Sequence, residues 1–261
     1  MLENLTQQPP DKIIMLSAMF REDKRDTKID LGVGVYKDVN GNTPIMRAVK
    51  KAEQLLWNQE TTKSYTALVG DGAFHKVIAD LVLGDSVSYD RLAFAHAPGG
   101  TGAIRQILEL IKVASPDATV WMSNPTWPNH PAMVKGVGIP METYTYLNME
   151  TRTVDFDGMM KNLANVKAGD VVILHGCCHN PTGANLSHMQ WCEVAALLNE
   201  KGAVPFVDIA YQGFGDGLDE DAFGVRLLAQ KCPEMLISAS CSKNFGIYRE
   251  RCGLVITLSK D

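Results

Sequence analysis

The chain has 261 residues, of which 46% are hydrophobic and 21% charged, and its net charge of −5 comes without a block of like charges. These values are ordinary for a folded globular protein and exclude disorder, and the length suits one large domain or two small ones. Because there is no basic face, we expect neither nucleic acid nor a membrane as a partner, and a small soluble substrate is the better expectation.

The cysteines and the first residues predict the cellular compartment. Six cysteines show no CxxC spacing, and the adjacent Cys177 and Cys178 cannot easily bridge each other, so we expect reduced thiols. The first ten residues contain neither the basic nor the apolar segment of a secretion signal, and no apolar run reaches membrane-spanning length. We therefore expect a cytoplasmic protein.

The first third of the chain predicts an arm, a short strand and two helices. Residues 1 to about 30 are polar, with an amphipathic piece over 11–20, and residues 29–36 have a strand pattern that two glycines interrupt. An apolar stripe predicts a helix that begins at Pro44, and a second stripe predicts a helix over 71–83. Tyr65 lies in the loop between them, where a packing role and a ligand contact are both possible.

From residue 91 onward, strand and helix signals alternate. We predict strands over 92–96, 118–123, 141–147, 171–175, 203–211, 234–239 and 252–258, and helices over 103–113, 155–166, 187–201 and 221–230. Such alternation is typical of an α/β domain with a mostly parallel sheet and helices on both faces.

Two turns of this region carry unusual residues. Pro98–Gly102 is a glycine-rich turn between a strand and a helix, an arrangement that points backbone N–H groups and a helix dipole toward an anion, most often phosphate. The segment 124–131 contains three prolines, so we expect a stiff loop that holds Trp127 and His130. Trp127 could stack on a heterocycle or be a buried structural residue.

Three more polar residues follow strands. Asn180 lies in a turn after the strand over 171–175, and its following proline favours an extended backbone. Asp208 ends an apolar strand, where a carboxylate is costly unless it meets a cation. Lys243 lies in the loop after the strand over 234–239, between small hydroxyl residues and eight residues before Arg251.

The carboxyl ends of the strands in a doubly wound sheet lie at one edge, so these residues can share a cleft. One ligand would use them all: an aromatic aldehyde with a phosphate, a ring nitrogen that pairs with a carboxylate and a ring oxygen that accepts hydrogen bonds. That ligand is pyridoxal phosphate, which forms an imine with a lysine.

Five motifs in order carry a resemblance to a known family: Gly100-Thr101-Gly102, Asn180-Pro-Thr-Gly183, Asp208-x-x-Tyr211, Ser240-x-Ser-Lys243 and Arg251. From about residue 13 to its end, the chain resembles the class I aminotransferases of the aspartate and aromatic amino acid group. The resemblance implies the fold of their large domain, with residues 1–43 as an N-terminal arm and part of a small domain. Residues 44–261 would then form the large, cofactor-binding domain.

The resemblance also implies roles at the cofactor ring. Lys243 would hold pyridoxal phosphate as an imine and later act as the base. Asp208 would keep the ring nitrogen protonated, while Asn180 and Tyr211 would hydrogen-bond the ring oxygen. Trp127 would stack on the ring.

The remaining implied roles concern the phosphate, the substrate and a second subunit. Arg251, Ser240 and the N–H groups of Gly100 and Thr101 would hold the phosphate. Gly34 would meet the substrate carboxylate, with Trp127 and Asn180 also near the substrate. Two further expectations are that His130 and His175 orient Asp208 and that Tyr65 reaches the phosphate of the neighbouring subunit, which implies a homodimer.

Two departures from the family pattern stand out. Gly99 occupies a position where many relatives have a serine, and the chain stops before the family's carboxylate-binding arginines. We therefore expect a C-terminally truncated enzyme that moves the amino group of an L-amino acid, of aspartate or aromatic type, to a 2-oxo acid such as 2-oxoglutarate. A decarboxylase or lyase on the same scaffold, or a non-catalytic truncated chain, are the alternatives.

Overall fold

The computed structural model describes residues 2–6, 12–30 and 34–260. It divides into two compact units, Met1–Pro44 and Ile45–Asp261. In the first unit, the short 3-10 helix η1 (Leu2–Asn4) precedes the helix α1 (Lys12–Glu22), which includes most of the amphipathic piece. The strand predicted over 29–36 is not seen in its described part: residues 29–30 and 34–36 are irregular, and its centre lies outside the described residues. A strand needs a hydrogen-bonded partner, and the described residues of this unit offer none.

The second unit begins with two helices of very different burial. The helix α2 (Arg47–Gln59) begins three residues after Pro44 and buries none of its residues, so Leu55 and Leu56 of its apolar stripe are 47% and 59% exposed. The helix α3 (Gly72–Leu83) begins where Asp71 accepts a hydrogen bond from the backbone N–H of Phe74, a typical N-terminal cap. In contrast to α2, the helix α3 packs into the core.

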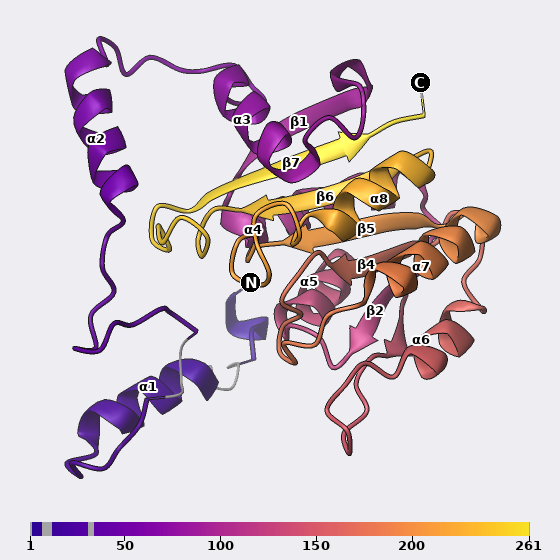
Figure 1. Ribbon diagram of the computed structural model, residues 1–261, viewed down its shortest axis with the longest axis horizontal. Helices are drawn as coiled ribbons and strands as arrows, with labels where there is room; N and C mark the ends of the chain where they lie inside the picture. Colours follow the sequence, from indigo (N-terminus) through magenta and orange to yellow (C-terminus); the bar gives the residue numbers. More distant parts are fainter. Residues whose placement is uncertain (1, 7–11, 31–33, 261) are drawn as a thin grey trace. The chain divides into compact units, whose positions relative to one another are not determined.

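Seven strands form one sheet in the order β1-β7-β6-β5-β4-β2-β3 (Figure 1). They are β1 (Leu92–Pro98, after the 3-10 helix η2, Tyr89–Arg91), β2 (Val120–Asn124), β3 (Met141–Thr145), β4 (Val171–His175), β5 (Val204–Ile209), β6 (Met235–Ser240) and β7 (Cys252–Leu258). All neighbours are parallel except β7, which runs antiparallel to both β1 and β6. The predicted mostly parallel α/β sheet is confirmed.

Helices cover both faces of this sheet, as predicted. The remaining helices are α4 (Gly99–Ala114), α5 (Asn129–Val137), α6 (Phe156–Leu163), α7 (His188–Lys201) and α8 (Phe223–Lys231). Along β4, Val171 and Ile173 pack with α4 and α5 on one face, while Val172 and Leu174 pack with α3 and α6–α8 on the other. This alternation is expected for a strand that is buried on both sides.

One prediction about local structure was wrong. The segment 124–131 is not entirely a loop, because α5 begins at Asn129 with Pro128 as its cap and therefore contains His130. Proline is tolerated in the first turn of a helix, where its missing N–H has no intrahelical partner, so Pro131 does not prevent this helix.

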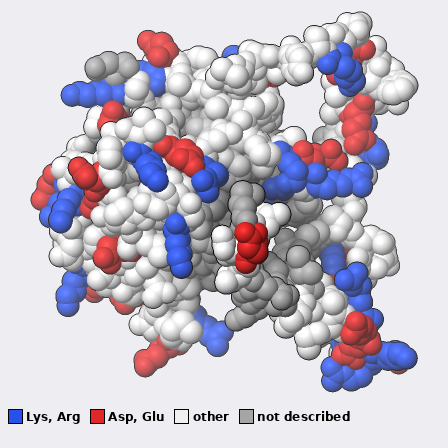
Figure 2. All heavy atoms as spheres, turned by 180° about the vertical axis from the view of Figure 1, so that it is seen from behind, with Lys and Arg blue, Asp and Glu red and all other residues white. Residues whose placement is uncertain are grey.

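The surface and the thiols fit the composition. Acidic and basic side chains are interspersed on the face shown in Figure 2. All six cysteines are free thiols. None of the described helices is long and apolar enough to cross a membrane.

Candidate active site

The parallel register aligns three polar residues at the carboxyl edge of the sheet. His175 on β4 is paired with Asp208 on β5, and Asp208 is paired with Ser238 on β6. Side chains that are paired in register lie on the same face of a sheet, so these three face the same layer. The strand ends therefore bring a histidine, a carboxylate and a hydroxyl together.

Both carboxylate oxygens of Asp208 have partners. Ser238 Oγ donates to Oδ1 at 2.7 Å, and the fully buried His130 donates from Nε2 to Oδ2 at 3.2 Å. Burial raises the pKa of Asp208, but the hydrogen bond from His130, the electrostatic contributions of the nearby His130 and His175 rings and the bond from Ser238 together outweigh it, so the pKa lies below its ordinary value. Asp208 is thus a mostly buried carboxylate that stays ionised.

A chain of hydrogen bonds extends behind Asp208. The backbone N–H of Asn180 donates to His175 Nδ1 at 3.2 Å, and His175 Nε2 lies 3.1 Å from the hydroxyl of Thr126. The same hydroxyl lies 2.8 Å from His130 Nδ1. Only one direction satisfies every group: His175 donates to Thr126, Thr126 donates to His130, and His130 donates to Asp208. This arrangement assigns a proton to Nε2 of both histidines.

The buried His179 packs against the half-buried His175. The ring of His179 lies 4.0 Å from that of His175, between centroids, and its nitrogens contact Ser123 Oγ at 2.8 Å and Thr182 Oγ1 at 2.9 Å. Burial, reinforced by the nearby His130, lowers the pKa of His175 to about 4, against the opposing charge of Asp208. Burial, reinforced by the other two histidines, lowers the pKa of His179 to about 2. His175 and His179 are therefore neutral at pH 7.

Lys243 lies beside the tyrosine that the sequence selected. Its Nζ is 5.4 Å from the centroid of the Tyr211 ring. Burial, with the charge of Arg251, lowers the pKa of Lys243, although Asp208 opposes this shift. A lysine whose ammonium form is disfavoured is closer to the neutral amine that acts as a nucleophile or a base.

Glycines and hydroxyls shape a site for an anion at the start of α4. No side chain caps this helix, whose first N–H groups, at Gly99, Gly100 and Thr101, have no intrahelical partners. A Cβ on Gly100 would lie 3.1 Å from Cβ of the buried Ser240, so the two residues are adjacent. The helix dipole and these N–H groups favour an anion here.

Gly99 is required by its surroundings. Its φ is +70°, and the guanidinium of Arg251 occupies the space where a Cβ would be. A Cβ on Gly253 of β7 would lie 2.5 Å from the carbonyl carbon and oxygen of Gly99. Arg251 itself is held by Ser242 Oγ at 3.3 Å and by the Tyr248 carbonyl at 2.9 Å. The glycine at position 99 therefore leaves space for the Arg251 guanidinium beside the N-terminus of α4.

The other predicted residues are placed as follows. Trp127 is half-buried with its ring edge-on to that of His130, at 5.3 Å between centroids. Tyr65 is fully exposed in the loop between α2 and α3. Gly34 is exposed and belongs to the unit Met1–Pro44. The roles predicted for Tyr65 and Gly34 stay predictions.

Sequence reasoning missed two residues that contact this network. Thr126 joins His130 to His175, and Ser238 donates directly to Asp208. A signal existed for Ser238, because it is one of two serines in an otherwise apolar strand and is fully buried. For Thr126, the proline-rich context indicated stiffness but not a bridging hydroxyl.

The site thus combines a lysine with a lowered pKa, an ionised carboxylate and a helix N-terminus that favours an anion. The comparisons with known proteins agree with this arrangement. The family described as "Aminotransferase class I and II" matches residues 26–260. The chain belongs to this family. The aminotransferase resemblance and fold predicted from the sequence are confirmed, and the enzymes of this family depend on pyridoxal phosphate.

Individual relatives are similar along the whole chain. An aromatic-amino-acid aminotransferase of Paracoccus denitrificans is 57% identical over 100% of this chain and 66% of its own length. An aspartate aminotransferase of Escherichia coli is 44% identical over 100% of this chain and 67% of its own length. A third relative is known from a crystal structure, that of an aromatic-amino-acid aminotransferase from Burkholderia pseudomallei covalently bound to pyridoxal phosphate. It is 38% identical with a TM-score of 0.96, and the match covers 100% of this chain and 67% of the Burkholderia chain. The chain spans about two thirds of the length of these relatives.

Proposed function

We propose that this protein is a pyridoxal-phosphate-dependent aminotransferase that moves the amino group of an L-amino acid to a 2-oxo acid such as 2-oxoglutarate. The observation that carries the proposal is the position of Lys243 beside Tyr211, close enough to Asp208 and Arg251 for their charges to act on its ammonium. Family membership and relatives named as aminotransferases support it, whereas no relative reported above favours the alternative of a decarboxylase or lyase.

The residues present fit the cofactor. Asp208 is a buried carboxylate whose own partners keep it ionised, so it suits a protonated ring nitrogen. The start of α4 has no capping side chain and lies beside Ser240 and Arg251, so it suits a phosphate. Around Gly99 the packing is so close that a larger residue would not fit. Asn180 and Tyr211 would donate to the ring oxygen, and Trp127 would lie against the ring.

Each residue has a chemical task in this proposal. When bound, pyridoxal phosphate supplies an electrophilic carbon for an amine and a ring that accepts electrons. Lys243 Nζ would hold the proton taken from the substrate Cα and return it, a task that its lowered pKa favours. The carboxylate of Asp208 would stabilise the positive charge of a protonated ring nitrogen. His130 and Ser238 fix the orientation of this carboxylate. Gly34, with Trp127 and Asn180, would contact the substrate.

We propose an aromatic amino acid as the preferred donor and aspartate as a second substrate. The support is that the relative at 57% identity is named an aromatic-amino-acid aminotransferase, whereas the one named an aspartate aminotransferase is 44% identical. The test is to compare kcat/KM for tyrosine, phenylalanine and aspartate with 2-oxoglutarate as acceptor. A higher value for aspartate than for both aromatic donors would reverse this assignment.

We further propose a cytoplasmic homodimer in which Tyr65 reaches the neighbouring subunit's phosphate. The support is that large apolar and aromatic side chains are exposed to water: Trp57 of α2 is 82% exposed, and Tyr65 and Leu68 are fully exposed. Exposed side chains of this kind often mark a protein–protein interface. Light scattering on the purified protein should give twice the subunit mass, and Trp57→Glu should shift the protein toward the monomer. A monomeric wild-type protein would exclude shared sites.

The cofactor assignment has a direct test. The protein is incubated with pyridoxal phosphate and reduced with borohydride, and the modified peptide is located by mass spectrometry. We expect one equivalent on Lys243, none on Lys243→Ala, and an unchanged level on the control Lys135→Ala, which removes an exposed lysine of α5. Labelling that is absent, or scattered over exposed lysines, would contradict the assignment.

A further inference from the structure

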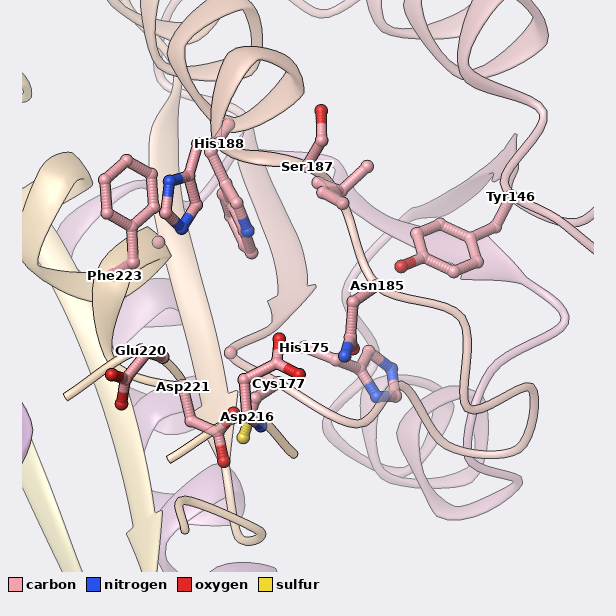
Figure 3. Close-up of a pocket in the computed structure, with 14 residues that line it drawn as sticks. Tyr146, His175, Cys177, Asn185, Ser187, His188, Asp216, Glu220, Asp221 and Phe223 are labelled. Carbon is pink, nitrogen blue, oxygen red and sulfur yellow. Dashed lines mark hydrogen bonds between the residues drawn. The ribbon is translucent and has the colours of Figure 1, made fainter. Parts of the chain in front are cut away.

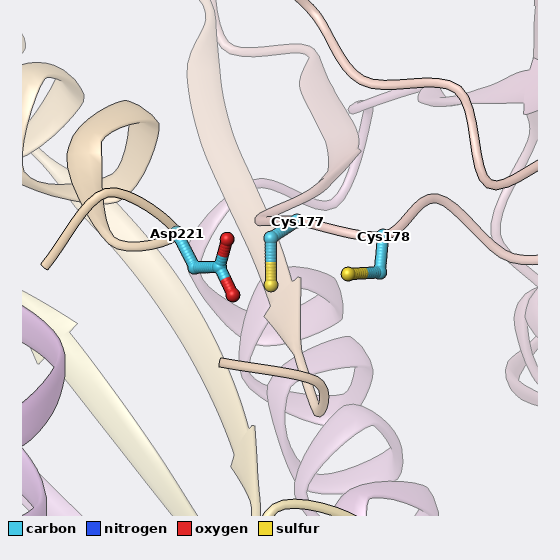
Figure 4. Close-up of side chains that lie close together, drawn as sticks. All are labelled: Cys177, Cys178 and Asp221. Carbon is cyan, nitrogen blue, oxygen red and sulfur yellow. The ribbon is translucent and has the colours of Figure 1, made fainter. Parts of the chain in front are cut away.

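Two thiols and a carboxylate converge on the side of the sheet edge that faces α7 and α8. The sulfurs of Cys177 and Cys178 and a carboxylate oxygen of Asp221 all lie within 4.8 Å of one another. Figure 4 shows the Asp221 carboxylate and the sulfur of Cys178 on either side of the sulfur of Cys177. Cys177 and Asp221 are each only 6% exposed. The roles proposed above use none of these three side chains.

The backbone brings the two adjacent sulfurs together. In extended chain, successive side chains point to opposite sides. Cys178 instead has a φ of +47°, a left-handed conformation that is uncommon for residues other than glycine. This turn, directly after β4, places both thiols on the side of Asp221.

Asp221 is held in place by backbone N–H groups. Its Oδ2 accepts from Gly213 at 2.8 Å and from Gly215 at 2.9 Å, and its Oδ1 accepts from Asp216 at 2.9 Å. A carboxylate oxygen can accept two hydrogen bonds, so Oδ1 keeps a lone pair for a further ligand. Such fixed carboxylates are typical of metal sites, in which neighbouring donors orient the ligands.

A path leads to the cluster. Cys177 and Asp221 line a cavity of about 140 Å³ together with the acidic residues Asp216 and Glu220 (Figure 3). The cavity can hold water, and its carboxylates attract cations. A cation bound to the three side chains would therefore have water available for a fourth position.

We propose that Cys177, Cys178 and Asp221 bind a thiophilic divalent cation of the zinc group. Two sulfurs, one carboxylate oxygen and one water make a tetrahedral set that suits zinc or cadmium and disfavours magnesium or calcium, which prefer oxygen ligands. Binding forms two metal–sulfur bonds and one metal–oxygen bond and releases the two thiol protons to solvent. Because Cys178 lies two residues before Asn180, a bound cation also restrains the segment that carries Asn180.

The release of protons makes binding depend on pH. A cysteine binds such a cation as the thiolate, so each of the two sulfurs must lose its proton before it can bind. The affinity for the cation should therefore rise as the pH increases from 6 to 8.

Cadmium alone is the probe for the test. The full protein, loaded with pyridoxal phosphate and kept reduced, is titrated with Cd²⁺ by calorimetry and by the ultraviolet charge-transfer band of cadmium thiolates. We expect one equivalent at high affinity, with release of protons and a band from two thiolates. Wild-type protein without this first equivalent would overturn the proposal.

The variants separate this site from other thiols and from effects on folding. Cys178→Gly removes the sulfur, and glycine adopts the positive φ without strain, so this variant should fold, which circular dichroism can check. It should bind Cd²⁺ at least about tenfold more weakly, because losing even a residue that only orients a metal ligand typically lowers metal affinity by about that factor. Cys192→Ser, which removes an exposed thiol of α7, should bind like the wild type. Unchanged affinity in Cys178→Gly, or lost affinity in Cys192→Ser, would contradict the assignment.

Discussion

Ser238 donates a 2.7 Å hydrogen bond to Oδ1 of Asp208 from the neighbouring parallel strand. Replacing Ser238 with alanine leaves that oxygen without its donor in a buried place, which raises the pKa of Asp208. Hydrogen bonds to charged groups are worth about 1.5–3 kcal/mol, so Ser238→Ala should weaken binding of pyridoxal phosphate by about tenfold or more. Ser123→Ala is the matched control, because Ser123 is also buried but contacts His179. Equal affinities in the two variants would show that Ser238 does not act through Asp208.

Thr126 is the only described hydroxyl that joins His130 to His175. Thr126→Val keeps the shape but removes both hydrogen bonds, so we expect a loss of about 1–3 kcal/mol in the free energy of unfolding and weaker cofactor binding. Thr182→Val removes a hydroxyl from His179 instead, and it should lower stability without changing cofactor affinity. Urea denaturation and cofactor titration measure the two quantities separately. If Thr126→Val left both unchanged, the proposed chain of hydrogen bonds would be wrong.

The lowered pKa values of His175 and His179 predict a loss of stability in mild acid. Burial lowers the pKa of His175 to about 4 and that of His179 to about 2, whereas an unfolded histidine titrates near 6.5. Below pH 6.5 the unfolded chain therefore binds protons that the native chain does not, so the free energy of unfolding falls as the pH drops from about 6.5 toward 4. At pH 5 the loss should be on the order of 1–2 kcal/mol for each of the two. The measurement is the urea midpoint at pH 7.5 and at pH 5, and His179→Gln should reduce the difference between them.

The contact between Gly253 and Gly99 predicts a steric effect. A Cβ at position 253 would lie 2.5 Å from the Gly99 carbonyl, and backbone atoms cannot move aside as a flexible side chain can. Gly253→Ala should therefore destabilise the protein by about 1–3 kcal/mol and weaken the binding of inorganic phosphate. Gly72→Ala is the control, because a Cβ on Gly72 would meet nothing within 4 Å. Comparable melting temperatures for the two variants would contradict the prediction.

The sequence predicted most of the sheet because its strands are short apolar runs bounded by turn residues. The last strand, predicted over 252–258, coincides with β7, and the cap at Ser187 and the stop at Gly202 correctly bounded α7. Strand order was less accessible, because an antiparallel β7 between β1 and β6 depends on tertiary pairing and not on local pattern. The helix α5 was missed because prolines dominate its start.

The sequence predicted those residues of the candidate site whose charge is unusual next to a buried strand. Lys243, Asp208 and Arg251 stood out because a charge near a buried strand needs a reason. The hydroxyls of Thr126 and Ser238 were not selected, since serine and threonine are common and their partners lie far away in sequence: Thr126 is 49 residues from His175, and Ser238 is 30 residues from Asp208. Only the fold shows which hydroxyls meet a histidine or a carboxylate.

The place of β7 in the sheet has a consequence for how the protein is made. Leu92 of β1 pairs with Leu258 of β7, so β1 and the start of α4 are synthesised long before the strand that joins them to β6. Until β7 has been synthesised and has paired, Gly99 lacks its neighbour Gly253 and the edge of β6 is uncovered. Pairing over such a separation is slow and leaves sheet edges open to association. A nascent chain that stalls before β7 should therefore depend on chaperones, and the anion site at α4 should be among the last features to form.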